Sequence, residues 1–154
     1  MSERSQARST NAPRVFIDAD AIIAAAFAGS VESAGYVLLL LGEATLLDCI
    51  TSRQVLTEVT RNVERLMPGR ALEAELIIRR ACRVVDDPSP DRVANAMAWA
   101  HAKDAPILAA AIEARCSVLV TFNVRHFAPP PDIVAIATPG AFLQRLRGQL
   151  AGWA

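Results

Sequence analysis

Two carboxylates interrupt an otherwise apolar stretch near the N-terminus, RVFIDADAII, in which Asp18 and Asp20 follow a segment with the pattern of a buried strand. An ionised carboxylate at such a place costs free energy unless water, a hydrogen bond or a metal ion compensates its charge. For Asp18 the structural explanation is a cap on the helix that follows, since Asp is a preferred N-cap residue. The chemical explanation is that the two acids bind a cation.

Three further polar residues occupy comparable places, namely Glu58, Asp104 and Asn123. Taken singly, each has an ordinary explanation, as a solvated helix residue, an N-cap and a turn residue respectively. Carboxylates that converge on one place repel each other, which raises their pKa values unless a cation binds. Mg²⁺ and Mn²⁺ are hard ions that prefer oxygen ligands, so the sequence predicts a site for one of them. No cluster of His or Cys at zinc-binding spacing is visible in the sequence.

The segments that must position these residues alternate between strand-like and helix-like patterns, which is typical of an α/β protein with a parallel sheet. The predicted strands are residues 14–18, 44–50, 82–86, 116–122 and 132–138. The predicted helices are residues 19–42 (with a break near Gly29 and Ser30), 51–66, 70–81, 87–103, 104–115 and 139–150. We therefore expect a three-layer α/β/α fold with a mostly parallel sheet of about five strands.

This fold class predicts where the polar residues meet. In an open parallel sheet, ligands bind outside the carboxyl ends of the strands. Asp18 and Asp20 follow the first predicted strand and Asn123 follows the fourth, with Thr121 one side-chain alternation before it. Asp104 begins the helix that leads into that fourth strand. All of them are therefore expected at one edge of the sheet.

Capping residues predict where several helices begin. Thr51 and Gln54 have the spacing of a capping box for the helix over residues 51–66. Ser89, followed by Pro and Asp, has the pattern of another helix start.

Length and composition indicate one globular domain over residues 14–150, preceded by a flexible tail over residues 1–13, because the chain has 154 residues and is 53% hydrophobic. The net charge is zero, so composition alone gives no argument for nucleic-acid binding. The longest apolar stretches are shorter than the about 20 residues needed to span a bilayer, and the polar start lacks the apolar region of a secretory signal. We therefore expect a cytoplasmic protein without a membrane partner and with three reduced, mostly buried cysteines.

The sequence resembles the PIN-domain ribonucleases, including the toxin component of VapBC-type toxin–antitoxin pairs. The resemblance rests on VFIDADAII, SRQVLTEVTRNV and, most specifically, KDAPILAAAIEARCSVLVTFNVRHF. It extends from about Arg14 to Thr138. Asp18, Glu58 and Asp104 match the three acids of the family, whereas Asn123 stands where many members have a fourth acid.

The resemblance implies that the protein cleaves single-stranded RNA with a metal-activated water, using Mg²⁺ or Mn²⁺ and no covalent intermediate. Asp18 and Asp104 would bind the metal directly, and Glu58 would bind a second metal or orient the water. Asn123 and Thr121 would hold water or the scissile phosphate, since asparagine offers a carbonyl oxygen but no charge.

Several neighbouring residues are secondary candidates. Asp20 either supplies the charge that Asn123 lacks or faces solvent. Arg53, Arg125 and His126 are candidates for phosphate contacts on the rim. For His126 a structural role is favoured over one as a catalytic acid or base.

The resemblance also implies partners: an RNA substrate, an antitoxin protein and a second copy of the chain in a homodimer. Two alternatives stay open. A PIN-like fold with a weakened site could bind nucleic acid or a protein without catalysis, which Asn123 and the neutral charge favour. The second alternative is that the protein is a metal-dependent phosphohydrolase of another kind. The sequence contains no aspartyl-phosphate motif, Walker loop or nucleophile elbow.

Overall fold

The computed structural model describes residues 12–27 and 33–152. Five strands form one sheet in the order β3-β2-β1-β4-β5, and every neighbouring pair is parallel. The strands are β1 (Arg14–Ile17), β2 (Asp48–Ser52), β3 (Arg83–Val85), β4 (Val118–Val120) and β5 (Ala135–Ala137). The predicted sheet of about five mostly parallel strands is confirmed.

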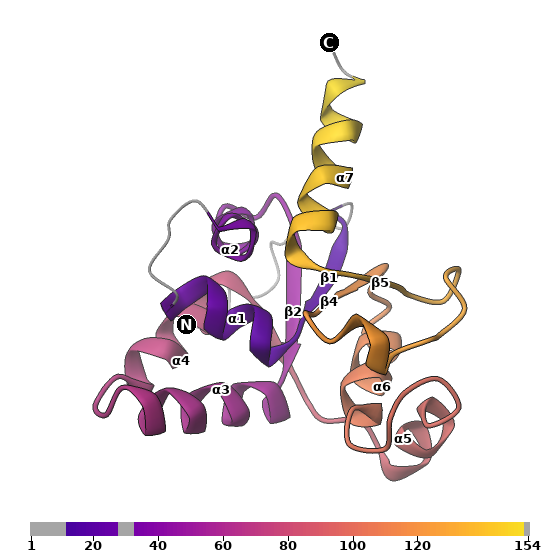
Figure 1. Cartoon of the computed structure of the whole chain (residues 1–154), viewed down its shortest axis with the longest axis horizontal. Helices are drawn as coiled ribbons and strands as arrows, with labels where there is room; N and C mark the ends of the chain where they lie inside the picture. Colours follow the sequence, from indigo (N-terminus) through magenta and orange to yellow (C-terminus); the bar gives the residue numbers. More distant parts are fainter. Residues whose placement is uncertain (1–11, 28–32, 153–154) are drawn as a thin grey trace, which may run out of the picture.

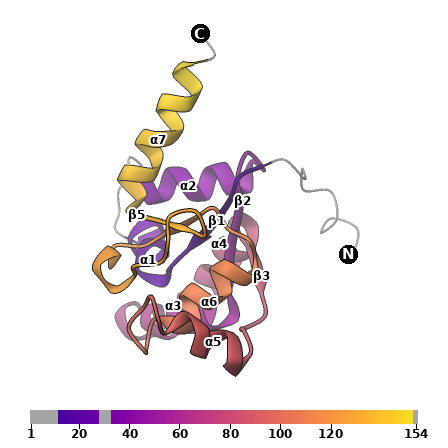
Figure 2. The same ribbon diagram turned by 90° about the vertical axis from the view of Figure 1, so that its right-hand side faces the viewer.

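Helices cover both faces of this sheet. The helices are α1 (Ala19–Phe27), α2 (Ala34–Glu43), α3 (Arg53–Leu66), α4 (Ala71–Ala81), α5 (Pro90–Ala96), α6 (Ala105–Glu113) and α7 (Pro139–Ala151), with a short 3-10 helix η2 (Val124–His126). Helices α1, α2, α3 and α4 pack together on one side of the sheet, and α5 packs on α6 on the other (Figure 1, Figure 2). Helix α7 contacts α2 and then projects away from the body of the molecule (Figure 1). The three-layer prediction is thus confirmed.

The centre of the sheet is almost completely apolar. Val15 and Phe16 of β1 and Leu119 and Val120 of β4 are fully buried, as expected for strands covered by helices on both faces. All three cysteines are buried. None of the helices in the described ranges is long and apolar enough to cross a membrane.

The structure differs from the predicted elements at several boundaries, and the strands predicted over residues 116–122 and 132–138 are shortened to Val118–Val120 and Ala135–Ala137. Strand β2 begins at Asp48, since residues 44–47 form a turn. The cap of α3 is Ser52, whose hydroxyl accepts a hydrogen bond from the Val55 amide at 3.3 Å, so the capping box predicted from Thr51 is wrong. The helix predicted over residues 87–103 ends at Ala96, while its predicted start is confirmed because Ser89 caps α5.

Two predictions concern residues outside the described ranges. The predicted break near Gly29 and Ser30 lies there, and so does all but the end of the predicted tail over residues 1–13.

Candidate active site

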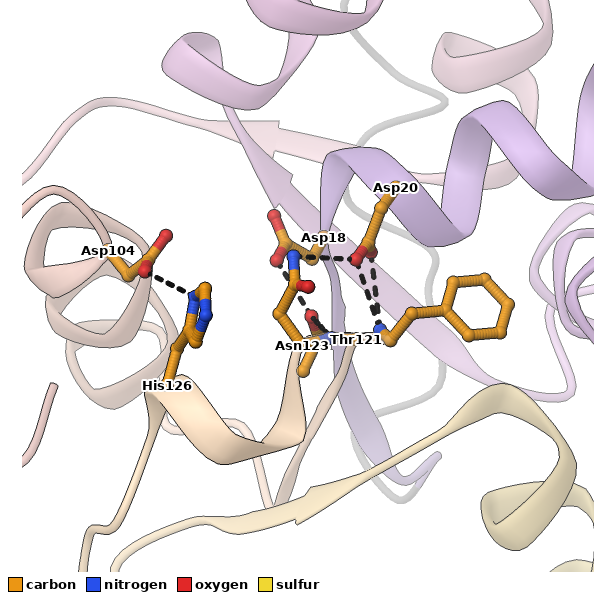
Figure 3. Close-up of polar contacts among 7 residues, drawn as sticks. Asp18, Asp20, Asp104, Thr121, Asn123 and His126 are labelled. Atoms are coloured by element: carbon orange, nitrogen blue, oxygen red, sulfur yellow. Dashed lines mark hydrogen bonds and ion pairs between the residues drawn. The ribbon is translucent and has the colours of Figure 1, made fainter. Parts of the chain in front are cut away.

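Asp18 lies at the carboxyl end of β1, where the chain turns into α1, and is only 8% exposed. Its Oδ1 accepts a hydrogen bond from the amide of Ala19 at 2.8 Å. Its Oδ2 accepts one from the hydroxyl of Thr121 at 2.9 Å, which joins the ends of two neighbouring strands (Figure 3). A hydrogen bond from the first amide of α1 therefore accounts for one carboxylate oxygen, and a hydroxyl at the end of β4 holds the second.

Burial makes ionisation of this carboxyl unfavourable. Loss of solvent raises the pKa of Asp18 to about 6, and repulsion from Asp20 and, more weakly, Glu58 acts in the same direction. Hydrogen bonds from Ala19 and Thr121 oppose the rise. Burial likewise raises the pKa of Asp20 above its ordinary value. Without a counter-ion, burial disfavours the negative charges of Asp18 and Asp20. A cation bound between them would offset these charges.

Asp20, in the first turn of α1, is bound to the segment that follows β4. Its Oδ2 accepts hydrogen bonds from the amide of Phe122 at 3.2 Å and from Nδ2 of Asn123 at 3.1 Å (Figure 3). The backbone amide of Asn123 in turn donates to the hydroxyl of Thr121 at 3.1 Å. Asn123 thus donates to a carboxylate at a place where a fourth acid would repel it.

Asp104 precedes α6 at the predicted N-cap position, but among the described residues its side chain caps nothing. Instead Oδ2 of Asp104 accepts a hydrogen bond from Nδ1 of His126 at 2.9 Å, and the Asp104 side chain is 15% exposed (Figure 3). The His101 ring stacks on the His126 ring, with centroids 4.6 Å apart and planes 13° from parallel. The role of the Asp104 side chain is therefore tertiary and not that of a helix cap.

His101, Asp104 and His126 together form a cluster that the sequence did not reveal, with ligand atoms within 4.8 Å of one another. Imidazole lone pairs lie in the plane of the ring, and two stacked, nearly parallel rings do not direct their lone pairs at one ion. We therefore read His126 as a residue that positions the Asp104 side chain, with the His101 ring packed on its own ring.

One pocket of about 190 Å³ collects most of the predicted residues. It is lined by Asp18, Asp20, Gln54, Glu58, Lys103, Asp104, Ile107 and Asn123. Thr121 is fully buried and is linked to the pocket through its hydrogen bonds with Asp18 and with the backbone amide of Asn123. Of the described residues that line this pocket, four are acids and one is a lysine. Their summed formal charge is negative, which suits a divalent cation.

Two predicted phosphate contacts are not among the described residues that line the pocket. Arg53, at the start of α3, forms an exposed ion pair with Asp86 at 3.0 Å. Arg125 is exposed on η2. The structure therefore gives no direct support to either arginine as a phosphate ligand.

Lys103 and Gln54 line the pocket but were missed by sequence reasoning. Lys103, the single lysine of the chain, directly precedes Asp104, and Gln54 lies one helical turn before Glu58. Residues four apart share one face of a helix, so this spacing was the available signal for Gln54.

The family model described as the PIN domain matches residues 14–125, most of the chain. The protein belongs to the PIN domain family. The matched residues of this PIN domain include Asp18, Glu58, Asp104 and Asn123. No curated protein matches the sequence at a significant level.

Solved structures agree with the PIN fold. The chain resembles one in the Rickettsia felis VapBC2 complex bound to a DNA fragment from its promoter, with a TM-score of 0.61 and 14% identity over 81% of this chain and 98% of that one. It also resembles VapC20 of Mycobacterium tuberculosis, a toxin that cleaves the sarcin–ricin loop, with a TM-score of 0.52 and 20% identity over 77% of this chain and 92% of that one. At such identities the likeness concerns the fold.

Proposed function

We propose that this PIN domain is a metal-dependent endoribonuclease and the toxin of a toxin–antitoxin pair. The observation that carries the proposal is the convergence of Asp18, Asp20, Glu58 and Asp104 around one pocket at the carboxyl edge of the sheet. The sarcin–ricin loop cleaved by the VapC20 relative supports RNA as the substrate class. The VapBC2 relative supports an antitoxin as the partner.

The donor set fits Mg²⁺ or Mn²⁺. The pocket offers carboxylate and amide oxygens, which these ions prefer, and burial leaves Asp18 in need of a compensating charge. Asp18 and Asp104 would hold the ion, and Glu58 would bind a second ion or orient water. When bound, such an ion activates water near neutral pH and stabilises charge on a phosphoryl oxygen.

The chain's own residues complete the mechanism. Thr121 orients the carboxylate of Asp18, and His126 orients that of Asp104. Lys103 attracts the phosphate backbone into a pocket that is otherwise negative. The side-chain carbonyl of Asn123, whose amide is engaged by Asp20, is available to a water or to the scissile phosphate.

Metal removal tests the proposal. A labelled single-stranded RNA is incubated with the wild-type protein in EDTA, in Mg²⁺ and in Mn²⁺. Cleavage is expected only with a metal, because the ion lowers the pKa of bound water and stabilises the charge that develops on the phosphoryl oxygen. The metal is also expected to raise the melting temperature, since it binds the folded state. Equal cleavage in EDTA would refute the metal-dependent mechanism.

A non-catalytic PIN module is the second candidate, because Asn123 replaces an acid and donates to Asp20. Folded protein that takes up Mn²⁺ and binds RNA but leaves it intact would favour this candidate.

Asn123→Asp tests whether residue 123 belongs to the metal site. The new carboxylate would lie beside Asp20, replacing a hydrogen bond of 3.1 Å by repulsion. We expect affinity for Mn²⁺ to rise about tenfold and the metal-free protein to lose about 1 kcal/mol of unfolding free energy at pH 7. Calorimetric Mn²⁺ titration and urea unfolding in EDTA measure both. Asn95→Asp, on an exposed position of α5, is the matched control. Equal metal affinity in the wild type and Asn123→Asp would contradict the assigned position.

A further inference from the structure

Phe122 is an exposed aromatic residue next in sequence to Asn123, which lines the acidic pocket. It directly follows β4 and stands between Thr121, which is fully buried, and Asn123, which lines the pocket. The Phe122 residue is 51% exposed, whereas the phenylalanines at 16, 127 and 142 are buried in the core. The fold therefore leaves one large aromatic side chain in solvent immediately beside the proposed catalytic residues.

The backbone fixes this position. The amide of Phe122 donates to Asp20 at 3.2 Å, so Phe122 is attached to the side of the site formed by α1. Asp18 lies between Asp20 and the Asp104–His126 pair (Figure 3). Phe122 thus stands on the far side of Asp18 from Asp104. Relative to a phosphate held between Asp18 and Asp104, Phe122 would lie on the side of Asp20.

We infer that Phe122 stacks on an unpaired nucleobase next to the scissile phosphate. The inference rests on the proposed nuclease function and adds to it a residue that contacts the substrate. Bases in unpaired RNA expose their faces to aromatic side chains, whereas bases in a duplex stack on each other. A phenyl ring has no hydrogen-bonding group, so it selects for an unpaired base and hardly for its identity.

Exposed apolar residues that occur singly are common on protein surfaces and need no function. Leu46, in the turn before β2, and Leu150, near the end of α7, are examples in this chain. Phe122 differs from both because its own backbone is hydrogen bonded to an acid of the pocket. Its aromatic ring also matches the chemistry of the substrate proposed for that pocket.

RNA binding in the Asp18→Asn background tests the inference, because this variant is expected to leave the RNA intact. The probes are a fluorescein-labelled single-stranded oligonucleotide and the duplex of the same sequence. Phe122→Ala is expected to weaken single-strand binding by about 5- to 50-fold, and Phe122→Trp by less than about threefold, because the indole ring preserves stacking. Duplex binding should stay within about twofold in both variants. Leu46→Ala is the matched control and should change neither affinity.

A fluorescent base reports stacking directly. Oligonucleotides that carry 2-aminopurine at successive positions should lose emission at one position on binding, with Phe122 or Phe122→Trp but not with Phe122→Ala. This readout would not respond to a merely structural role of Phe122.

The outcomes separate the inference from the proposed function. Cleavage by the wild type with unchanged single-strand affinity in Phe122→Ala would overturn the stacking contact alone. RNA bound through Phe122 but never cleaved would support the contact and refute the nuclease. Loss of a protein partner in Phe122→Ala, with RNA affinity intact, would assign the residue to a protein interface and overturn the inference.

Discussion

Asp18→Asn is expected to abolish RNA cleavage and, at the same time, to stabilise the metal-free protein at neutral pH. Cleavage should fall by about a hundredfold or more, because the variant removes a charged oxygen ligand from the proposed metal site. Stability should rise because the carboxyl of Asp18 is buried and its pKa is raised from 3.8 to about 6. An amide at this position needs no compensating cation.

The sign of the pH dependence follows from this pKa. The folded protein holds the proton on Asp18 more tightly than the unfolded chain does, so the associated stability is present below about pH 4 and is lost as pH rises through about 6. At about 1.4 kcal/mol per pKa unit, the ionised group costs roughly 3 kcal/mol at pH 7. We therefore expect the stability advantage of Asp18→Asn to grow between pH 4 and pH 7.

Urea unfolding in EDTA across this pH range measures the effect. Asp132→Asn, at an exposed turn position, is the matched control and should show no comparable change with pH. Saturating Mg²⁺ or Mn²⁺ should reduce or reverse the advantage, because the metal stabilises only the wild type. Wild-type cleavage rates in Asp18→Asn would contradict the assignment of this residue as a metal ligand.

Asp104→Asn is expected to abolish cleavage with little change in stability. The Asp104 side chain caps nothing among the described residues, and the asparagine oxygen can still accept the hydrogen bond from His126. The substitution removes only the negative charge that Asp104 presents to the pocket, so the free energy of unfolding in EDTA should change by less than about 1 kcal/mol. Metal affinity and the cleavage rate should each fall by about a hundredfold or more.

Cleavage of labelled RNA and Mn²⁺ titration check this second prediction. Asp91→Asn, in the exposed first turn of α5, is the control for replacing an acid near a helix start. Retained cleavage at the wild-type rate would exclude Asp104 from the metal site. A large loss of stability would instead show that the charge of Asp104 serves the fold through His126.

The sequence predicts the layers and the edge of the site because both follow from short-range patterns. An apolar run such as VLV of β4 indicates a strand that is buried on both faces, and the alternation of elements implies parallel pairing. Parallel strands place their carboxyl ends together, which is why the sequence alone predicts that Asp18 and Asn123 converge.

Element boundaries were less predictable because tertiary contacts set them. Thr51 and Ser52 pair with Val84 and Val85 of β3, which extends β2 and moves the cap of α3 to Ser52. The chain after α5 leaves the helix because Trp99 accepts a backbone hydrogen bond from Ala128. Neither pairing is visible in the local sequence.

The polar partners within the site were the least predictable part. The hydrogen bond from Asn123 to Asp20 and the one from Thr121 to Asp18 each join residues 103 positions apart. The contact between His126 and Asp104 depends on the path of η2 after β4. Side-chain directions at such separations follow from the assembled sheet and not from spacing along the chain.

The strand order has a consequence for synthesis on the ribosome. Strand β4 lies between β1 and β5, so Thr121 reaches Asp18 only after a late segment has been inserted beside the first strand. At about 5–20 residues per second, translation needs on the order of 5–20 s to proceed from Asp18 to Thr121. During that interval the nascent chain holds its first acids without Thr121, Asn123 or His126 to orient them. The proposed ribonuclease would therefore lack its complete site until most of its own message has been translated.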